Sequence, residues 1–200
     1  MRATRWLAAV LAVVAWGGLV LQYVIFAERV GHALAAWRFV GFFTVLSNIG
    51  IAAIATAVAV GRQGWLTGAR ARLMGLTAIV TVGFVYSLLL RSLWSPTGLS
   101  KLADAILHDV TPILFVALWA LMPHGELRWR DLKWALAPPF LYLAYSMARG
   151  AFDGWYPYYF LNPAVQTLPE LVAGMVGMML VFAIIAGSAI AIDIRLARRT

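Results

Sequence analysis

The chain has 200 residues, of which 63% are apolar and 12% are charged, and it carries a formal net charge of +8 and no cysteine. Soluble domains contain about 45–50% apolar and about 25% charged residues, so this composition excludes an ordinary soluble domain. The absence of cysteine excludes disulfides and thiolate chemistry, and the scattering of basic residues in short groups disfavours a nucleic-acid surface.

Six apolar stretches approach the roughly 20 residues that a helix needs to cross a bilayer. We expect spans at residues 6–27, 38–60, 72–90, 104–122, 134–148 and 168–192, of which the fifth is the shortest and most polar. The first stretch is too long for a signal-peptide core and lacks a convincing cleavage site, so it is expected to be retained. The predicted fold is an all-α integral membrane six-helix bundle, a single domain over residues 1–200.

The basic residues predict the orientation of this bundle. An even number of spans puts both termini on one side, which would hold 11 of the 16 basic residues and leave 5 on the other. Because basic residues are enriched in cytoplasmic loops, both termini are expected in the cytoplasm. The predicted location is a bacterial inner membrane, with membrane lipids as environment and partners and with no nucleic acid.

Polar side chains recur at one depth, in the outer halves of four predicted spans. The candidate residues are Thr44, Ser47, Asn48, Tyr86, His108, Asp109, Tyr145 and Arg149. Polar groups in a membrane commonly mark helix contacts or function, and together they predict a polar chamber that opens outward. Each has a structural alternative: a Thr bonds its own helix, an Asn joins two helices, an Arg extends to the interface and a Tyr packs as an aromatic.

A hydroxyl beside an imidazole is the chemistry that this set best supports. The three histidines are dispersed and the spans contain no paired carboxylates, so no metal site or cofactor is expected. In covalent acyl transfer, Thr44 would attack an ester and His108 would take its proton, while Asn48 or a Tyr hydroxyl would donate to the oxyanion. Asp109 lies about 100° around the helix from His108, which makes it a poor orienting partner.

The loop between the last two spans, residues 150–163, is dense in aromatic residues and includes Tyr156. Aromatic residues favour the membrane interface, so an interfacial belt is one interpretation. An ordered lid over the bundle is the other.

Four motifs resemble the androgen-induced protein and androgen-dependent TFPI-regulating protein family of six-span membrane proteins. Residues 43–48 resemble its Phe-Thr-x-x-Ser-Asn motif, and residues 107–112 resemble the His-x-x-x-Pro segment of its bacterial branch. Residues 85–91 and the run from Arg149 through residue 161 also fit. The resemblance covers roughly residues 38–165.

This resemblance implies a threonine hydrolase that cleaves fatty-acid esters of hydroxy fatty acids or related lipids. By this resemblance, Thr44 would be the nucleophile and His108 its catalytic partner. Substrate contacts are then expected from Asn48, Ser47, Tyr86, Asp109, Tyr145, Arg149 and Tyr156. The His-to-Pro spacing and the aromatic loop follow the bacterial branch rather than the animal one. The identity of the substrate lipid, and whether the protein retains hydrolysis, therefore stay open.

Two other functions remain open on the sequence. The same chamber could bind or transport a lipid or small amphiphile without chemistry, or the protein could be a structural partner of another membrane protein through its aromatic loop. Small residues at four-residue spacing in 168–192 would let a helix pack closely, either from the same chain or from a second copy.

Overall fold

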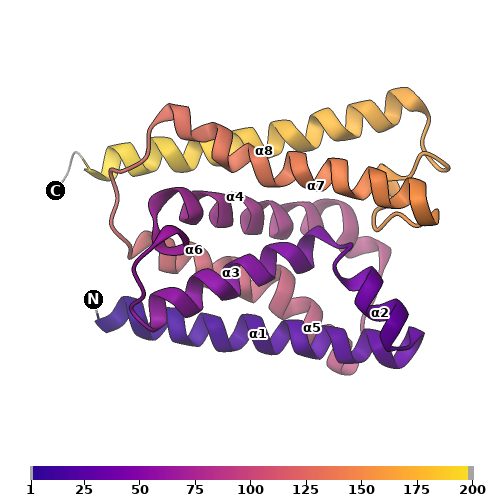
Figure 1. The fold of residues 1–200 in the computed structure, drawn as a ribbon, viewed down its shortest axis with the longest axis horizontal. Coiled ribbons are helices and arrows are strands. Elements are labelled where there is room, and N and C mark those ends of the chain that lie inside the picture. The colour runs from indigo at the N-terminus through magenta and orange to yellow at the C-terminus, as the bar shows by residue number, and fades with distance from the viewer. Residues whose placement is uncertain (1, 198–200) are drawn as a thin grey trace.

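The apolar stretches fold into helices that run along one axis of the molecule (Figure 1). The computed structural model describes residues 2–197, and within this range the chain is helical and contains no strand. The α-helices are α1 (Arg2–Val30), α2 (His32–Phe39), α3 (Phe43–Ala59), α4 (Ala69–Val85), α5 (Gly98–Ala105), α6 (Thr111–Ala120), α7 (Leu132–Asp153) and α8 (Leu168–Ala197). The all-α prediction is confirmed.

Within the described part of the chain, four helical segments are long and apolar enough to cross a membrane, and the bent pair α2–α3 raises the number to five. The four are Arg2–Val30, Ala69–Leu93, Gly98–Ala120 and Leu168–Ala197. These are the features of a membrane protein. Helix α7 has 22 residues, but it contains Pro138 and Pro139 and is less apolar than these segments.

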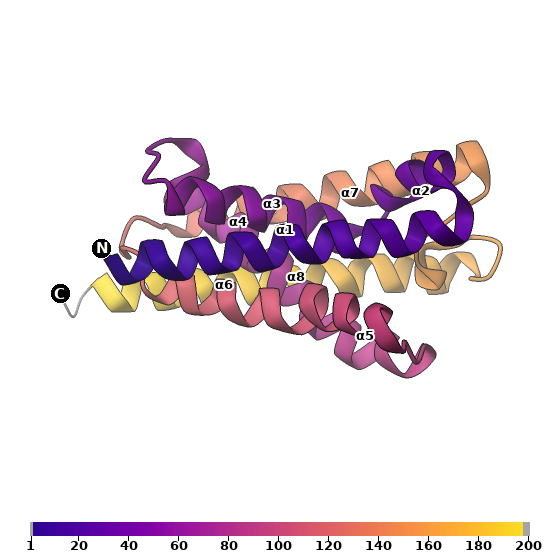
Figure 2. The ribbon, with the colours of Figure 1, turned by 90° about the horizontal axis from the view of Figure 1, so that it is seen from below.

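Helix α4 lies at the centre of the bundle and packs against α3, α6, α7 and α8. Helix α1 packs mainly on α3, and α7 lies beside α8 (Figures 1 and 2). The beginning of α1 and the end of α8 lie at the same end of the bundle, which we call the terminal end (Figure 1). We call the opposite end the distal end.

The stretch 38–60 is not one continuous helix as expected. Helices α2 and α3 meet at an angle of 78°, and the break lies at residues 40–42. A Cβ atom on Gly41 would lie 2.7 Å from the Trp155 ring and 2.9 Å from the Arg38 carbonyl oxygen, so only glycine fits there. A contact with a distant part of the chain therefore shapes this break.

Two helices widen into π-helical turns at the distal end. One turn is Tyr86–Leu90 (η2), which continues α4, and the other is Ile106–Val110 (η4), which joins α5 to α6. Pro112 has no N–H to donate to the helix, which contributes to the irregular backbone before it. Turns of this kind occur frequently at functional sites, and these two bring Tyr86 and His108 together.

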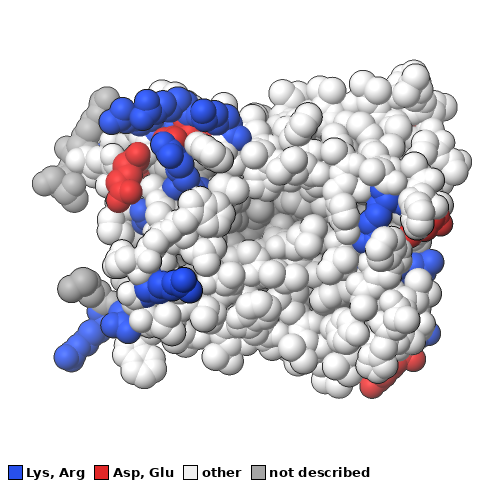
Figure 3. Space-filling view, viewed as in Figure 1, with Lys and Arg blue, Asp and Glu red and all other residues white. Residues whose placement is uncertain are grey.

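Charged side chains gather at the two ends of the bundle, and the face in Figure 3 has a broad charge-free belt between them. Large apolar side chains are exposed on helices α1, α6, α7 and α8 and on η2, among them Val13, Leu88, Ile113, Phe140 and Ile184. Such a belt is suited to contact with lipid chains rather than with water.

Candidate active site

A cavity of about 400 Å³ lies at the distal end. It is bounded by α1, the beginning of α3, the two π-helical turns and the aromatic loop before α8. Its polar lining includes Thr44, Tyr86, Asp104, His108 and Tyr158. Two of these, Thr44 and His108, are the predicted nucleophile and base, and they reach the same space from different helices.

The imidazole of His108 is held by Asp104, one helical turn earlier. Its Nδ1 lies 3.0 Å from the Asp104 carbonyl oxygen and 3.2 Å from the Asp104 carboxylate. Both neighbours are acceptors, so the proton belongs on Nδ1. Nε2 is then the basic nitrogen, and it has no hydrogen-bond partner within residues 2–197.

Tyr86 completes this cluster. Its ring stacks on His108 with centroids 3.8 Å apart and planes 16° apart, and its hydroxyl donates to Asp104 Oδ2 at 2.6 Å. Asp104 therefore bonds both rings at once and holds them face to face. Asp104 was not among the site residues predicted from the sequence, although its four-residue spacing from His108 was a usable signal.

Thr44 differs from three other threonines in α3 and α4. Thr56, Thr77 and Thr81 each donate to the carbonyl four residues earlier, at 2.7 to 2.9 Å. Thr44 is the second residue of α3, so the residue four before it lies at the break, outside the helix. Its hydroxyl is consequently available to other partners.

Tyr158, from the aromatic loop, meets Thr44 at the cavity wall. The Thr44 backbone N–H donates to the Tyr158 hydroxyl at 3.4 Å, and the Thr44 side chain bonds the same hydroxyl. Burial raises the pKa of Tyr158, which keeps the phenol neutral and able to donate. This loop was predicted from its aromatic residues as a cover or an interfacial belt, but the predicted substrate contact was Tyr156 rather than Tyr158.

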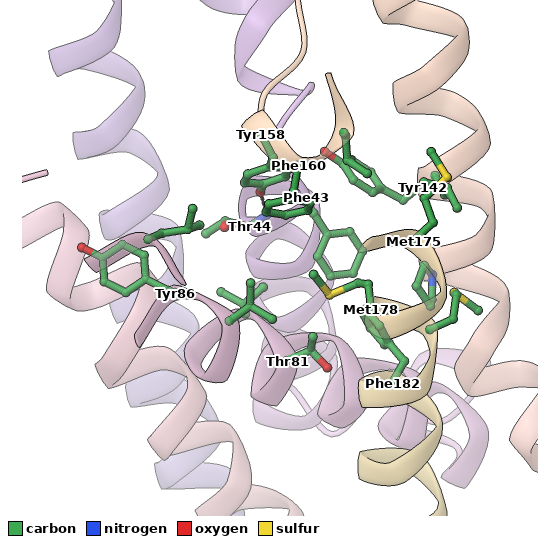
Figure 4. A pocket seen from close by; sticks show the side chains of 17 residues that line it. Phe43, Thr44, Thr81, Tyr86, Tyr142, Tyr158, Phe160, Met175, Met178 and Phe182 are labelled. Carbon is green, nitrogen blue, oxygen red and sulfur yellow. Dashed lines mark hydrogen bonds between the residues drawn. The ribbon is translucent and has the colours of Figure 1, made fainter. Parts of the chain in front are cut away.

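A second, narrower cavity of about 70 Å³ adjoins the first. Thr44, Tyr86 and Tyr158 line both cavities. Figure 4 shows Thr44 and Tyr86 on one side of this space and Met175, Met178 and Phe182 on the other. Thr44 thus lies at the junction between a polar cavity and an apolar slot.

Asn48 and Ser47 lie outside the cavity that Thr44 and His108 share. Asn48 is fully buried, and its Nδ2 donates to the carbonyls of Thr44 at 2.8 Å and Leu107 at 3.2 Å. Its amide therefore joins α3 to η4, which is the structural alternative raised for it above. Ser47 is buried along a separate groove between α3, α4 and α7.

Tyr145 and Arg149 connect α7 to α2. Arg149 donates to the Tyr145 hydroxyl at 2.7 Å and to the Trp37 carbonyl, and its guanidinium lies 4.0 Å from the Trp37 ring centroid. Asp109 forms an ion pair with Arg91 and not with His108. The polar residues predicted to share one chamber are therefore divided among several contacts.

The aromatic loop covers the distal end of the bundle. Trp155 and Tyr158 pack edge-on against Phe42, with centroids 5.4 and 6.2 Å apart, and Pro157 lines the polar cavity. Tyr156 fills the space above Gly150, where a Cβ would lie 2.1 Å from its ring. The loop is an ordered cover over the cavity.

Comparisons with known proteins give no match: no family model, no curated protein and no solved structure is significantly similar to this chain. Within residues 2–197, no group of three His, Asp or Glu side chains is placed to hold a metal ion.

Proposed function

We propose that this protein is an intramembrane lipid-ester hydrolase with Thr44 as nucleophile and His108 as general base. In this proposal the bundle crosses a bacterial inner membrane six times, with α7 as the fifth crossing and both termini in the cytoplasm. The distal cavity then lies in the outer half of the bilayer, where a lipid ester can enter from the side. The resemblance to the androgen-induced protein family supports fatty-acid esters of hydroxy fatty acids, or related lipids, as substrates.

One observation carries the proposal: Nε2 of an oriented histidine and a threonine hydroxyl that does not bond its own helix share one cavity. Among the described residues, Thr44 and His108 form no hydrogen bond with each other, and the cavity lies between them. Catalytic hydrogen bonds are often long in unliganded enzymes and shorten when substrate binds. The junction at Thr44 also suits an ester, whose acyl chain would enter the methionine-lined slot.

The chemistry needs only groups present in the cavity. Thr44 Oγ1 attacks the ester carbonyl carbon while its proton passes to His108 Nε2. The Tyr158 hydroxyl, which contacts Thr44, would donate a hydrogen bond to the developing oxyanion. The ester C–O bond breaks as His108 returns the proton to the leaving alcohol, and water, activated by the same imidazole, then hydrolyses the acyl-threonine.

Matched threonine variants test this proposal. Thr44→Val removes the hydroxyl at nearly constant volume and is expected to lower ester cleavage on the order of 10⁴-fold. Thr81→Val is the control, because Thr81 lines the same apolar slot while its hydroxyl bonds the Thr77 carbonyl. Equal cleavage by Thr44→Val and wild type, measured on folded protein in detergent, would refute Thr44 as the nucleophile.

Binding or transport of an amphiphile without chemistry is the second candidate, and the wall that the polar cavity and the apolar slot share at Thr44, Tyr86 and Tyr158 favours it. The same experiment separates the two functions. A non-catalytic binder would retain lipid during purification and would release no fatty acid from an ester, in wild type or in Thr44→Val.

A further inference from the structure

A second large cavity lies at the terminal end, far from the proposed active site. Its volume is about 650 Å³, and it is bounded by the beginning of α1, the connection from α3 to α4 and the turn after α6. Its charged lining comprises Arg5, Arg62, Arg72 and Glu126. Three cations therefore face one anion, and Figure 3 shows other Lys and Arg side chains at the same end.

Arg72 is the buried member of this set, with 4% of its surface exposed. One Nη donates to the Pro123 carbonyl at 2.9 Å, while the other lies 3.9 Å from Glu126, beyond hydrogen-bond distance. Its Nε is buried and has no partner within residues 2–197. A buried guanidinium normally has a carboxylate at hydrogen-bond distance, and Arg72 has only the longer ion pair with Glu126.

Asp193, a buried carboxylate that also attracts Arg72, has hydrogen-bond partners of its own. Asp193 accepts hydrogen bonds from the backbone N–H groups of Gly125 and Leu127, at 2.9 and 3.0 Å, and lies 3.1 Å from His124. Glu126, the carboxylate in the cavity lining, has 61% of its side chain exposed to solvent. Glu126 and Asp193 attract the charge of Arg72, but neither forms a hydrogen bond with its guanidinium, and the buried Nε stays available to a ligand in the cavity.

Arg5 and Arg62 extend this positive lining. Arg5 donates from Nε to the Ala59 carbonyl at 3.1 Å, and its guanidinium lies against Gly61. Gly61 has φ +70°, a backbone conformation that other residues rarely adopt, and a Cβ there would lie 3.3 Å from the Arg5 guanidinium. Arg62 is exposed and has no ion-pair partner among the described residues.

We propose that this cavity binds a phosphate-bearing anion. Guanidinium groups match the oxygens of phosphate through paired hydrogen bonds, and three of them from separate elements can surround one phosphate. Val58, Leu121 and Met122 add apolar surface to the lining. The same chemistry is available from an anionic phospholipid headgroup in the membrane or from a free phosphate.

The test is thermal unfolding of the full-length protein in a neutral detergent at constant ionic strength. The probes are short-chain phosphatidylglycerol, inorganic pyrophosphate and, as a neutral headgroup, short-chain phosphatidylcholine. The expected result is a saturable rise in the unfolding midpoint with one of the two anions and none with phosphatidylcholine. Saturation by phosphatidylglycerol alone identifies a lipid headgroup, and saturation by pyrophosphate identifies a free phosphate.

Variants link that shift to the cavity. Arg62→Gln is expected to weaken apparent binding about tenfold, because a charge-assisted hydrogen bond is lost while no internal contact of Arg62 is broken. Arg130→Gln is the matched control, since Arg130 is exposed at the same end but does not line the cavity. The proposal is overturned if neither anion gives a saturable shift, or if Arg62→Gln and Arg130→Gln bind as wild type does.

Discussion

Two aspartate–histidine pairs lie at opposite ends of this bundle and share nearly the same contact. Asp104 approaches His108 Nδ1 at 3.2 Å at the distal end, and Asp193 approaches His124 Nδ1 at 3.1 Å at the terminal end. Their surroundings differ. Nε2 of His124 faces the Ala120 carbonyl at 3.4 Å, whereas Nε2 of His108 is unpartnered among the described residues.

The two carboxylates also have different tasks. One Asp193 oxygen accepts from two backbone N–H groups and holds the turn after α6, whereas the second Asp104 oxygen accepts from the Tyr86 hydroxyl at the cavity wall. An aspartate–histidine contact alone therefore does not indicate a catalytic site. What distinguishes the distal pair is a free nitrogen, a cavity and a hydroxyl facing that cavity.

The largest expected difference between the pairs is in activity. His108→Ala removes the general base and is expected to lower ester cleavage by about 10²- to 10⁴-fold. His124→Ala removes a side chain outside the cavity, so turnover per folded molecule is expected to stay within about twofold of wild type. Initial rates of ester cleavage on equal amounts of folded protein measure the activity of both variants. Equal losses of activity in the two variants would contradict the assignment of His108 as the catalytic histidine.

The reverse difference is expected in stability. Asp193→Asn replaces a buried charge that three donors surround, and bonds to charged groups contribute about 1.5–3 kcal/mol each. We expect a loss of about 3 kcal/mol in the free energy of unfolding, read from a denaturation curve in detergent. Asp104→Asn serves as the comparison, and its free energy of unfolding is expected to fall by less. An unchanged curve for Asp193→Asn would contradict a structural role for the terminal pair.

Asp104 is proposed to act by positioning His108. Asp104→Asn is expected to lower kcat about 10- to 100-fold, with KM little changed, because a charge-assisted bond to the imidazole is weakened. Asp109→Asn is the matched control, since that carboxylate pairs with Arg91. Recovery of kcat in Asp104→Glu would support positioning, whereas equal kcat in the two asparagine variants would argue against it.

The smallest expected effect belongs to Tyr86. Tyr86→Phe keeps the ring stacked on His108 and removes only the hydroxyl that bonds Asp104. A bond to a carboxylate contributes about 1.5–3 kcal/mol, but this one acts on the imidazole only through Asp104, so kcat is expected to fall severalfold. Tyr145→Phe, which loses a bond to the Val40 carbonyl outside the cavity, is the control. A larger loss of kcat in Tyr145→Phe than in Tyr86→Phe would indicate that the Tyr145 contact on α7, and not the Tyr86–Asp104 bond, matters for turnover.

The apolar runs were sufficient to predict the helical class and the long membrane-type segments, because hydrophobic length is a local property. The α2–α3 break was not predictable, since Gly41 and its neighbours read as apolar and the deciding contact comes from Trp155. That break also moves Thr44 from the interior of a span to the first turn of α3.

The candidate site was predictable where it depends on spacing along the chain. Thr44 and His108 were found as polar residues at similar depth, and Asp104 could have been found from its position one turn before His108. The partnership of Thr44 with Tyr158 joins residues 114 positions apart through a loop, which no periodicity indicates.

The most direct test of the proposed chemistry is covalent labelling with a fluorophosphonate, with the modified residue identified by mass spectrometry. An activated hydroxyl is expected to give an adduct on Thr44 in wild type that disappears in His108→Ala and persists in His124→Ala. Folded wild-type protein with no adduct on Thr44, or a Thr44 adduct that persists in His108→Ala, would contradict a threonine nucleophile activated by His108.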